Sequence, residues 1–171
     1  MTNFLNPADV SATALVQRTT TSSTAVSTWS TGKSIFTAVQ APTDTDITTV
    51  KIVFSGTGFT DATADTLVLN ADIAMGSNFT GTGISLGGVS GINFNYASAS
   101  KTLLLTHGDV VPSASNVVTP FSAAEVAAIS NAVKLKLTAA GTYKTEIFFG
   151  DSGLYHNEAF SLSSSATHTV V

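Results

Sequence analysis

The sequence predicts an all-β protein, an immunoglobulin-like or jelly-roll-like β-sandwich with one short helix near residues 123–131. Two observations carry most of this prediction. Apolar and polar residues alternate along many short segments, and clusters of Gly, Asp, Asn and Ser separate one segment from the next. The spacing is close to the roughly 8–12 residues typical of sandwich strands. Thr and Ser, which suit sheet surfaces, make up more than a quarter of the chain.

The chain of 171 residues is long enough for one domain with its own core and too short for two ordinary domains. Within it, composition changes near residue 44. Residues 1–44 are rich in Ser and Thr and predict an N-terminal arm, which could act as a donated strand. Residues 45–171 show the regular strand pattern and predict the sandwich itself.

The N-terminal arm combines a hydroxyl-rich run with apolar islands. Thr19–Thr24 is almost entirely Thr and Ser, whereas Leu15, Val16, Val26 and Trp29 are apolar, and several of them are prone to form strands. An arm with such islands can pair with a sheet. We therefore expect these four residues to be the assembly residues of the arm.

Alternation with a period of two identifies the strands of the sandwich. Val50, Ile52 and Phe54 alternate with Lys51 and Ser55, as in a strand with one buried face. The same reasoning predicts further strands at Ser34–Val39, Leu67–Asn70, Gly83–Leu86, Ile92–Tyr96, Thr102–Thr106, Val133–Leu137, Tyr143–Phe149, Phe160–Leu162 and Thr167–Val171.

One segment departs from this period and predicts the helix. Ser122 can accept a hydrogen bond at the helix N-terminus, and Glu125, three residues later, can accept one from the Ser122 amide. Phe121 and Val126 occupy the two positions of a hydrophobic staple. These signals predict a short helix over about residues 123–131, between two strands.

Charge and cysteine content exclude several function classes. Only 18 residues are charged, the net charge is −4, and Arg18 is the single arginine. Such a chain lacks the basic surface that nucleic acid or an anionic membrane requires. No run approaches the roughly 18 apolar residues of a membrane span. The absence of Cys excludes disulfides, thiolate zinc sites and thiol nucleophiles.

No set of residues predicts catalysis. Gly150–Gly153 reads Gly-Asp-Ser-Gly, which resembles the nucleophile motif of trypsin-like serine proteases. That mechanism needs a His and an Asp far apart in sequence before the Ser. Here His107 and Asp109 nearly adjoin and Ser152 follows too soon, so we interpret the motif as a turn. The three histidines are too dispersed in sequence to indicate a zinc site. We expect a protein that is not an enzyme.

Calcium is the one candidate cofactor. Hard cations bind carboxylates and carbonyls that loops bring together, and five aspartates in predicted loops are weak candidates. These are Asp44, Asp46, Asp61, Asp65 and Asp151. Turn and cap roles are the alternative interpretation of the same residues.

From about Thr45 onward the order of elements resembles the cadherin-like or immunoglobulin-like repeats of large type I-secreted bacterial adhesins. The resemblance covers about three-quarters of the chain, from the strand Thr49–Phe54 through the acidic turn Asp61–Asp65 to the final strand near Phe160. It includes the short helix Ser122–Ala128 and the strand Gly141–Ile147. It implies an extracellular adhesive β-sandwich. Calcium at repeat junctions is less well supported, because the chain has only 8 Asp.

Together these observations predict a structural or adhesive protein of the bacterial cell surface or extracellular matrix. We expect it to assemble with itself into a filament through strand exchange, without nucleic acid or membrane insertion, and to be exported without a conventional N-terminal signal. Two alternatives remain open: a coat or decoration protein of a virion, and a carbohydrate-binding module whose exposed aromatics stack on a glycan. Few charges are available to prevent strands of other chains from pairing with the sheet edges, which favours a protein whose edges are paired in its assembly.

Overall fold

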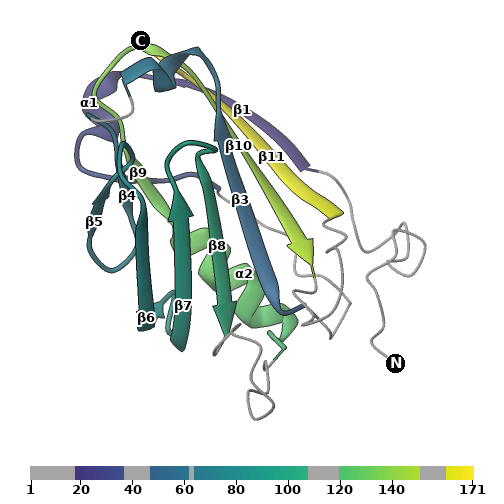
Figure 1. Cartoon of the computed structure of the whole chain (residues 1–171). Helices are drawn as coiled ribbons and strands as arrows, with labels where there is room; N and C mark the ends of the chain where they lie inside the picture. The colour runs from purple at the N-terminus through teal and green to yellow at the C-terminus, as the bar shows by residue number, and fades with distance from the viewer. Residues whose placement is uncertain (1–17, 37–46, 62–63, 108–119, 151–160) are drawn as a thin grey trace.

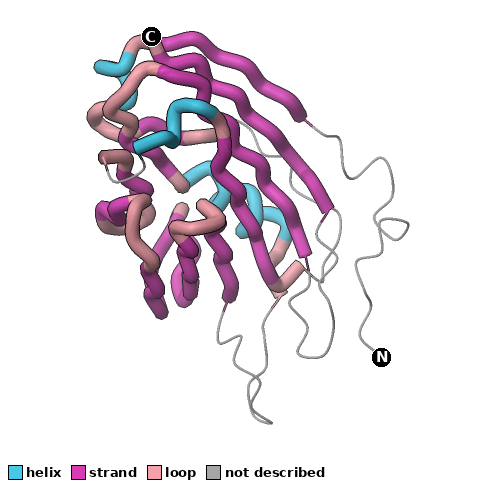
Figure 2. The backbone as a smooth tube through the Cα atoms, turned by 45° about the horizontal axis from the view of Figure 1, so that its top comes forward, coloured by secondary structure: helices cyan, strands magenta, loops and turns pink. Residues whose placement is uncertain are grey.

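The structure is a computed structural model that describes residues 18–36, 47–61, 64–107, 120–150 and 161–171. In these residues the chain forms two β-sheets that face each other, and the longest helix has ten residues (Figure 1). The predicted all-β sandwich is therefore confirmed. Figure 2 shows the long strands of the larger sheet as one curved layer.

The larger sheet has seven strands, in the spatial order β1 (Arg18–Thr24), β11 (Ser161–Val170), β10 (Gly141–Gly150), β3 (Thr49–Ser55), β8 (Thr102–His107), β7 (Val89–Ala97) and β6 (Phe79–Leu86). The smaller sheet has four short strands, in the order β2 (Lys33–Ser34), β9 (Lys134–Lys136), β4 (Thr66–Val68) and β5 (Asp72–Ala74). The helical segments are α1 (Val26–Trp29), the 3₁₀ turn η1 (Thr57–Asp61) and α2 (Ala123–Ala132).

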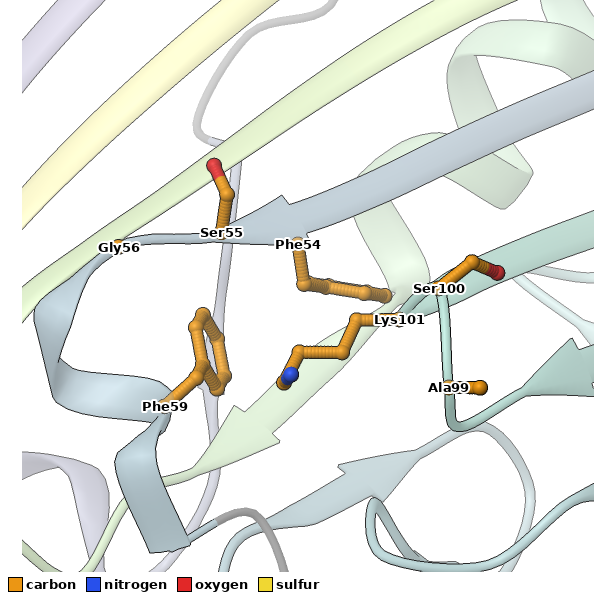
Figure 3. A pocket seen from close by; sticks show the side chains of 7 residues that line it. All are labelled: Phe54, Ser55, Gly56, Phe59, Ala99, Ser100 and Lys101. Carbon is orange, nitrogen blue, oxygen red and sulfur yellow. The ribbon is translucent and has the colours of Figure 1, made fainter.

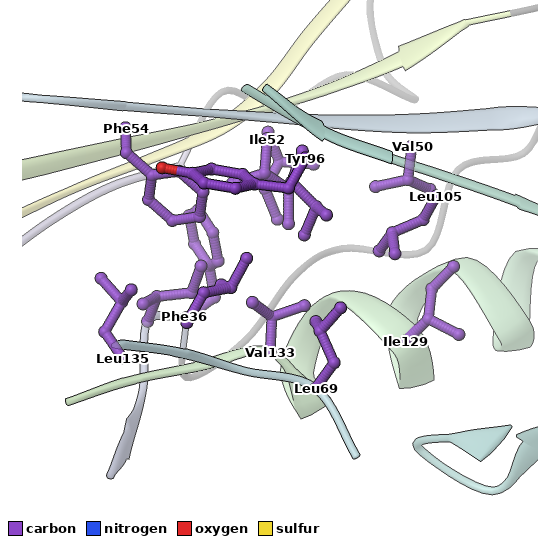
Figure 4. Packing of buried hydrophobic residues seen from close by; sticks show 14 of the residues in the cluster. Phe36, Val50, Ile52, Phe54, Leu69, Tyr96, Leu105, Ile129, Val133 and Leu135 are labelled. Carbon is purple, nitrogen blue, oxygen red and sulfur yellow. The ribbon is translucent and has the colours of Figure 1, made fainter. Parts of the chain in front are cut away.

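The core lies between the sheets, and the predicted alternation places it correctly. Val50, Ile52 and Phe54 of β3 are at most 2% exposed, while Lys51 between them is only partly buried. Figure 4 shows these side chains facing residues that belong to or adjoin the smaller sheet, such as Phe36, Val133 and Leu135. Burying such aliphatic and aromatic side chains is the main favourable term in folding.

The helix α2 begins where the sequence predicts. The Glu125 amide donates to Ser122 Oγ at 3.2 Å, and the Ser122 amide donates to Glu125 Oε2 at 2.8 Å, which completes the capping box. Phe121 and Val126 are both buried, as the staple predicts. The Phe121 amide also donates to the Ile47 carbonyl at 2.7 Å, which fixes the helix start beside β3.

Several elements differ from the prediction. Where the sequence predicts a strand over Ser34–Val39, β2 covers only Lys33–Ser34, and residues 37–46 lie outside the described residues. The strand β5 (Asp72–Ala74) was not predicted. The last two predicted strands are one continuous strand, β11, of ten residues; Phe160 lies outside the described residues. The serines of Ser163–Ser165 interrupt the apolar pattern, but β11 pairs with β10 on one side and β1 on the other. Hydrogen bonds on both sides hold the backbone extended where side-chain pattern alone does not.

Candidate functional site

The most informative feature is the stretch of residues 18–36, here called the N-terminal segment. It is the described part of the predicted arm. Its first strand, β1, forms one edge of the seven-stranded sheet, and its second, β2, forms one edge of the four-stranded sheet. The single turn α1 joins them (Figure 1). One continuous stretch of chain therefore supplies an edge strand to both sheets.

β1 pairs with the C-terminal strand along its whole length. The pairing is parallel and runs from Arg18 opposite Ser164 to Thr24 opposite Val170. It continues past the strand ends, because the Val171 amide donates to the Thr24 carbonyl at 3.0 Å and the Val26 amide donates to the Val171 carbonyl at 3.0 Å. Without β1, β11 would be an open edge.

Trp29 anchors the N-terminal segment between the sheets. Its side chain is fully buried, and its indole nitrogen donates to Thr24 Oγ1 at 2.7 Å. The ring lies edge-on to the His168 ring with 4.8 Å between centroids, and Lys33 Nζ lies 5.0 Å from the Trp29 ring centre. Ile35 and Phe36 of the same segment are also in the core.

The predicted assembly residues therefore have different places. Trp29 lies in the core of its own chain, and Val26 is partly buried against that core. Leu15 and Val16 lie outside the described residues. Residues 18–36 are an integral part of the folded sandwich in this single chain. The strand that pairs with the sheet is the hydroxyl-rich run Arg18–Thr24, whereas the apolar island Val26–Trp29 forms the turn α1.

His168 on β11 connects the N-terminal segment to the sheet. Its Nε2 lies 3.1 Å from the Ile35 carbonyl oxygen, and its Nδ1 lies 2.7 Å from Ser22 Oγ. A carbonyl only accepts, so Nε2 carries the proton in the neutral ring and Nδ1 accepts from the Ser22 hydroxyl. Burial lowers the pKa of His168 below 6.5, and the Lys33 charge lowers it further against the opposing effect of the bond to Ile35.

Sequence reasoning missed this role of His168. The only local signal is that His168 shares a strand face with Ala166 and Val170, which are both buried. Alternation could therefore have predicted a buried histidine. The partners Ser22, Trp29 and Ile35 are more than 130 residues away in sequence, and only the parallel pairing of β1 with β11 brings them together.

The two edges of the seven-stranded sheet carry few charges. Arg18 is the one charged residue of β1, and β6 has none. Edge strands usually carry charges that prevent pairing with other chains. β6 has instead two register irregularities against β7, one between Gly81 and Ile84 and one between Ile84 and Leu86. Such bulges disfavour edge-to-edge pairing, so β1 is the less protected edge.

A shallow pocket of about 280 Å³ opens where β3 meets η1 and the β7–β8 turn. Figure 3 shows the Lys101 side chain extending toward Phe59, with Phe54 beside it. Both rings are at most 4% exposed, so a ligand would meet mainly the backbone, Ser55, Ser100 and the lysine. Lys101 has φ of 47°, a left-handed conformation that ends the β7–β8 turn.

Of the five calcium candidates, Asp65 is the one whose side chain the structure describes. Asp65 is 1% exposed, and its Oδ1 accepts from the Thr138 amide at 3.1 Å. That role matches the turn interpretation. Among the described residues no group of three His, Asp or Glu side chains is placed to hold a metal. Asp44, Asp46 and Asp151 lie outside the described residues, as does the Asp61 side chain, so calcium binding stays a prediction.

Most aromatic side chains that could have formed a sugar platform are in the core. Tyr96 and Tyr143 are fully buried, Phe149 is 2% exposed, and Phe94 packs against the same core. Of the large aromatic side chains that the structure describes, Phe79 is the exposed one, at 40%. One ring gives no extended stacking surface.

Comparison of the sequence with known protein families found no matching family, and comparison with curated proteins found no significant match. No helix in the described part of the chain is both long and apolar enough to span a bilayer.

Proposed function

We propose that this protein is a non-enzymatic structural subunit that assembles with copies of itself by exchanging the N-terminal segment. One observation supports this most directly: residues 18–36 form an edge strand in both sheets and place Trp29 between them. A segment at the edges can leave and be replaced without breaking any interior strand pairing.

Exchange would conserve every contact of the segment. A second copy supplies the same β1, Trp29 and β2, so each sandwich keeps its hydrogen bonds and core while the connection runs between chains. Residues 37–46 join the segment to the rest of the sandwich in sequence. If each copy donates to the next, the arrangement is head-to-tail, and such an arrangement gives an open filament unless it closes into a ring.

The cost of an empty acceptor favours this exchange. A sandwich whose segment has left exposes the β11 edge and the cavity that Trp29, Ile35 and Phe36 filled. Losing one buried tryptophan alone typically costs about 3–5 kcal/mol. An open sandwich would therefore bind a donated segment in preference to remaining empty.

Paired cysteines can test whether β1 lies on its own chain or on another. Thr21 and Thr167 are register partners on the outer face, and the natural chain has no Cys. Neighbouring strands bring such Cα atoms within disulfide range. In assembled material of the double variant Thr21→Cys and Thr167→Cys, oxidation should give a ladder of covalent multimers on a non-reducing gel. Oxidation before assembly should lock β1 in place and abolish filaments until a reductant is added.

A matched pair provides the control. Thr142 and Thr169 are register partners on β10 and β11, which both stay within one chain. The variant Thr142→Cys with Thr169→Cys should give only intrachain disulfides and should assemble normally after oxidation. Assembled material of the test variant that contains only intrachain disulfides would contradict strand exchange.

We assign the assembly to the bacterial cell surface or extracellular matrix, as the resemblance to adhesin repeats implies. The β1 edge carries few of the charges that would prevent pairing with another strand, which supports a role in which a strand of another copy covers this edge. Electron microscopy of the purified protein tests the form of assembly. Filaments are the expected result, whereas closed shells would favour the coat protein of a virion and monomers at all concentrations would oppose both.

A further inference from the structure

His168 contacts three places along the N-terminal segment, two through hydrogen bonds and one through a ring contact. His168 itself lies on β11, and its contacts are Ser22 on β1, Trp29 in α1 and the carbonyl of Ile35 just after β2. One imidazole thus contacts β1, α1 and the residue that follows β2. A change in the charge of His168 therefore affects its contacts with Ser22, Trp29 and Ile35 together.

The surroundings of His168 suit the neutral ring and oppose the charged one. The neutral ring with a proton on Nε2 satisfies both bonds, because Ser22 donates to Nδ1. A second proton on Nδ1 would force the Ser22 hydroxyl to turn and accept instead. Because His168 is only 7% exposed in the docked state, a charged ring there would also lose most of the water that solvates it when the segment is released.

The charged group near this histidine also disfavours its protonation, and the other neighbouring side chains are neutral. Lys33, on β2 in the docked segment, is the charged group that repels a protonated His168. On β10 the register partner is Tyr143, whose pKa burial raises, so it stays neutral near pH 7. On β1 and α1 the partners Ser22 and Trp29 carry no charge.

We propose that His168 is a pH switch for the N-terminal segment: protonation at mildly acidic pH weakens the docking of residues 18–36 on their own sandwich and so makes them more available for exchange. The effect of this switch on assembly rests on the proposed function. The effect of pH on docking of residues 18–36 can be measured in the single chain. Docking lowers the pKa of His168 below the 6.5 of a solvated imidazole. Release therefore takes up a proton, and it becomes more favourable as pH falls below about 6.5.

Amide hydrogen exchange of the full chain tests the release without assembly. Protection of the β1 amides, corrected for the intrinsic pH dependence of exchange, is compared at pH 7.5 and pH 5.0. Protection of β3, an interior strand, is the internal reference. We expect β1 protection to fall by about threefold or more at pH 5.0 relative to β3, because each unit of pKa difference changes the docking equilibrium up to tenfold.

Two variants assign the effect to His168. His168→Gln should remove the pH dependence of β1 protection, whereas His107→Gln, which changes the described histidine on β8, should leave it intact. If His168→Gln does not fold, Lys33→Gln serves instead. Removing the repelling charge raises the pKa of docked His168, so the drop in β1 protection between pH 7.5 and 5.0 should become smaller.

The outcomes separate the switch from the proposed function. Equal β1 protection at both pH values, or an unchanged drop in His168→Gln, would overturn the switch, even if the protein assembles by exchange. A His168-dependent drop supports the switch, even if the cysteine pairs then show that assembly does not exchange strands. If both proposals hold, filaments of the unmodified chain should form faster at pH 5.0 than at pH 7.5.

Discussion

At the scale of single residues, the high Thr and Ser content extends into the core. The side chains of Thr49, Ser130 and Thr145 are buried, and their hydroxyl oxygens have no hydrogen-bond partner among the described residues. A buried hydroxyl without a partner loses its bonds to water and gains none. These positions are therefore places where the sequence gives up stability.

Thr145 provides the clearest test of this cost. It is fully buried on β10, so Thr145→Val keeps the branched shape and removes the unpaired hydroxyl. We expect the free energy of unfolding in urea to rise by about 1 kcal/mol. The matched control is Thr106→Val on β8, because Thr106 is buried and its hydroxyl is not among the buried oxygens that lack a hydrogen-bond partner. That variant should lose stability, and equal effects at both positions would contradict the explanation.

At the scale of elements, the helix α2 shows how a local signal survives in the fold. Its capping box satisfies amides at the helix start that have no partner within the helix. The bond from the Ser122 amide is the largest cause of the lowered pKa of Glu125. Glu125 is therefore charged, and its bond to Ser122 intact, above its ordinary pKa of 4.5, and this contribution is lost as pH falls through the lowered value.

Removing the cap should weaken the helix by a predictable amount. Ser122→Ala leaves the Glu125 amide without its acceptor, and such changes typically cost about 1 kcal/mol. Urea unfolding at pH 7 measures the difference. Ser77→Ala is the control, because Ser77 is an exposed serine in the turn between β5 and β6. If the two variants unfold at the same urea concentration, the capping box does not stabilise α2.

At the scale of the whole molecule, the N-terminal segment closes the sandwich along one side. Deleting it would remove β1, Trp29 and β2 together, so loss of assembly after deletion would not separate a missing donor from a damaged acceptor. Returning the segment as a separate peptide separates the two. Like the cysteine pairs, this experiment tests whether the segment can dock on a sandwich that belongs to another chain.

A chain of residues 37–171 should therefore gain stability from a peptide of residues 18–36. A ligand that binds only the folded state adds about 2.7 kcal/mol at a hundredfold excess over its Kd, so the thermal midpoint should rise with peptide concentration. Circular dichroism measures the midpoint. The peptide with Trp29→Ala is the matched control, and it should raise the thermal midpoint much less at the same concentration. A midpoint that is independent of peptide concentration would contradict exchange of the segment.

Local patterns in the sequence predicted much of the fold. Alternation located β3, β7, β8 and β10, and the capping residues Ser122 and Glu125 located α2, because these signals act between residues close in sequence. The ends of elements were less predictable. The serine-rich middle of β11 reads as a break, and only its pairing with two neighbouring strands makes it continuous.

The sequence by itself determined that this protein is a β-sandwich with few charges to protect its edges. Only the tertiary structure decided where residues 18–36 of the hydroxyl-rich arm lie, because the partner of a strand is set by backbone hydrogen bonds between segments distant in sequence. It placed β1 parallel to β11 and so brought Ser22, Trp29 and Ile35 around His168. That contact joins residues 18–36 to the C-terminal strand β11, and no local pattern in either segment contains it.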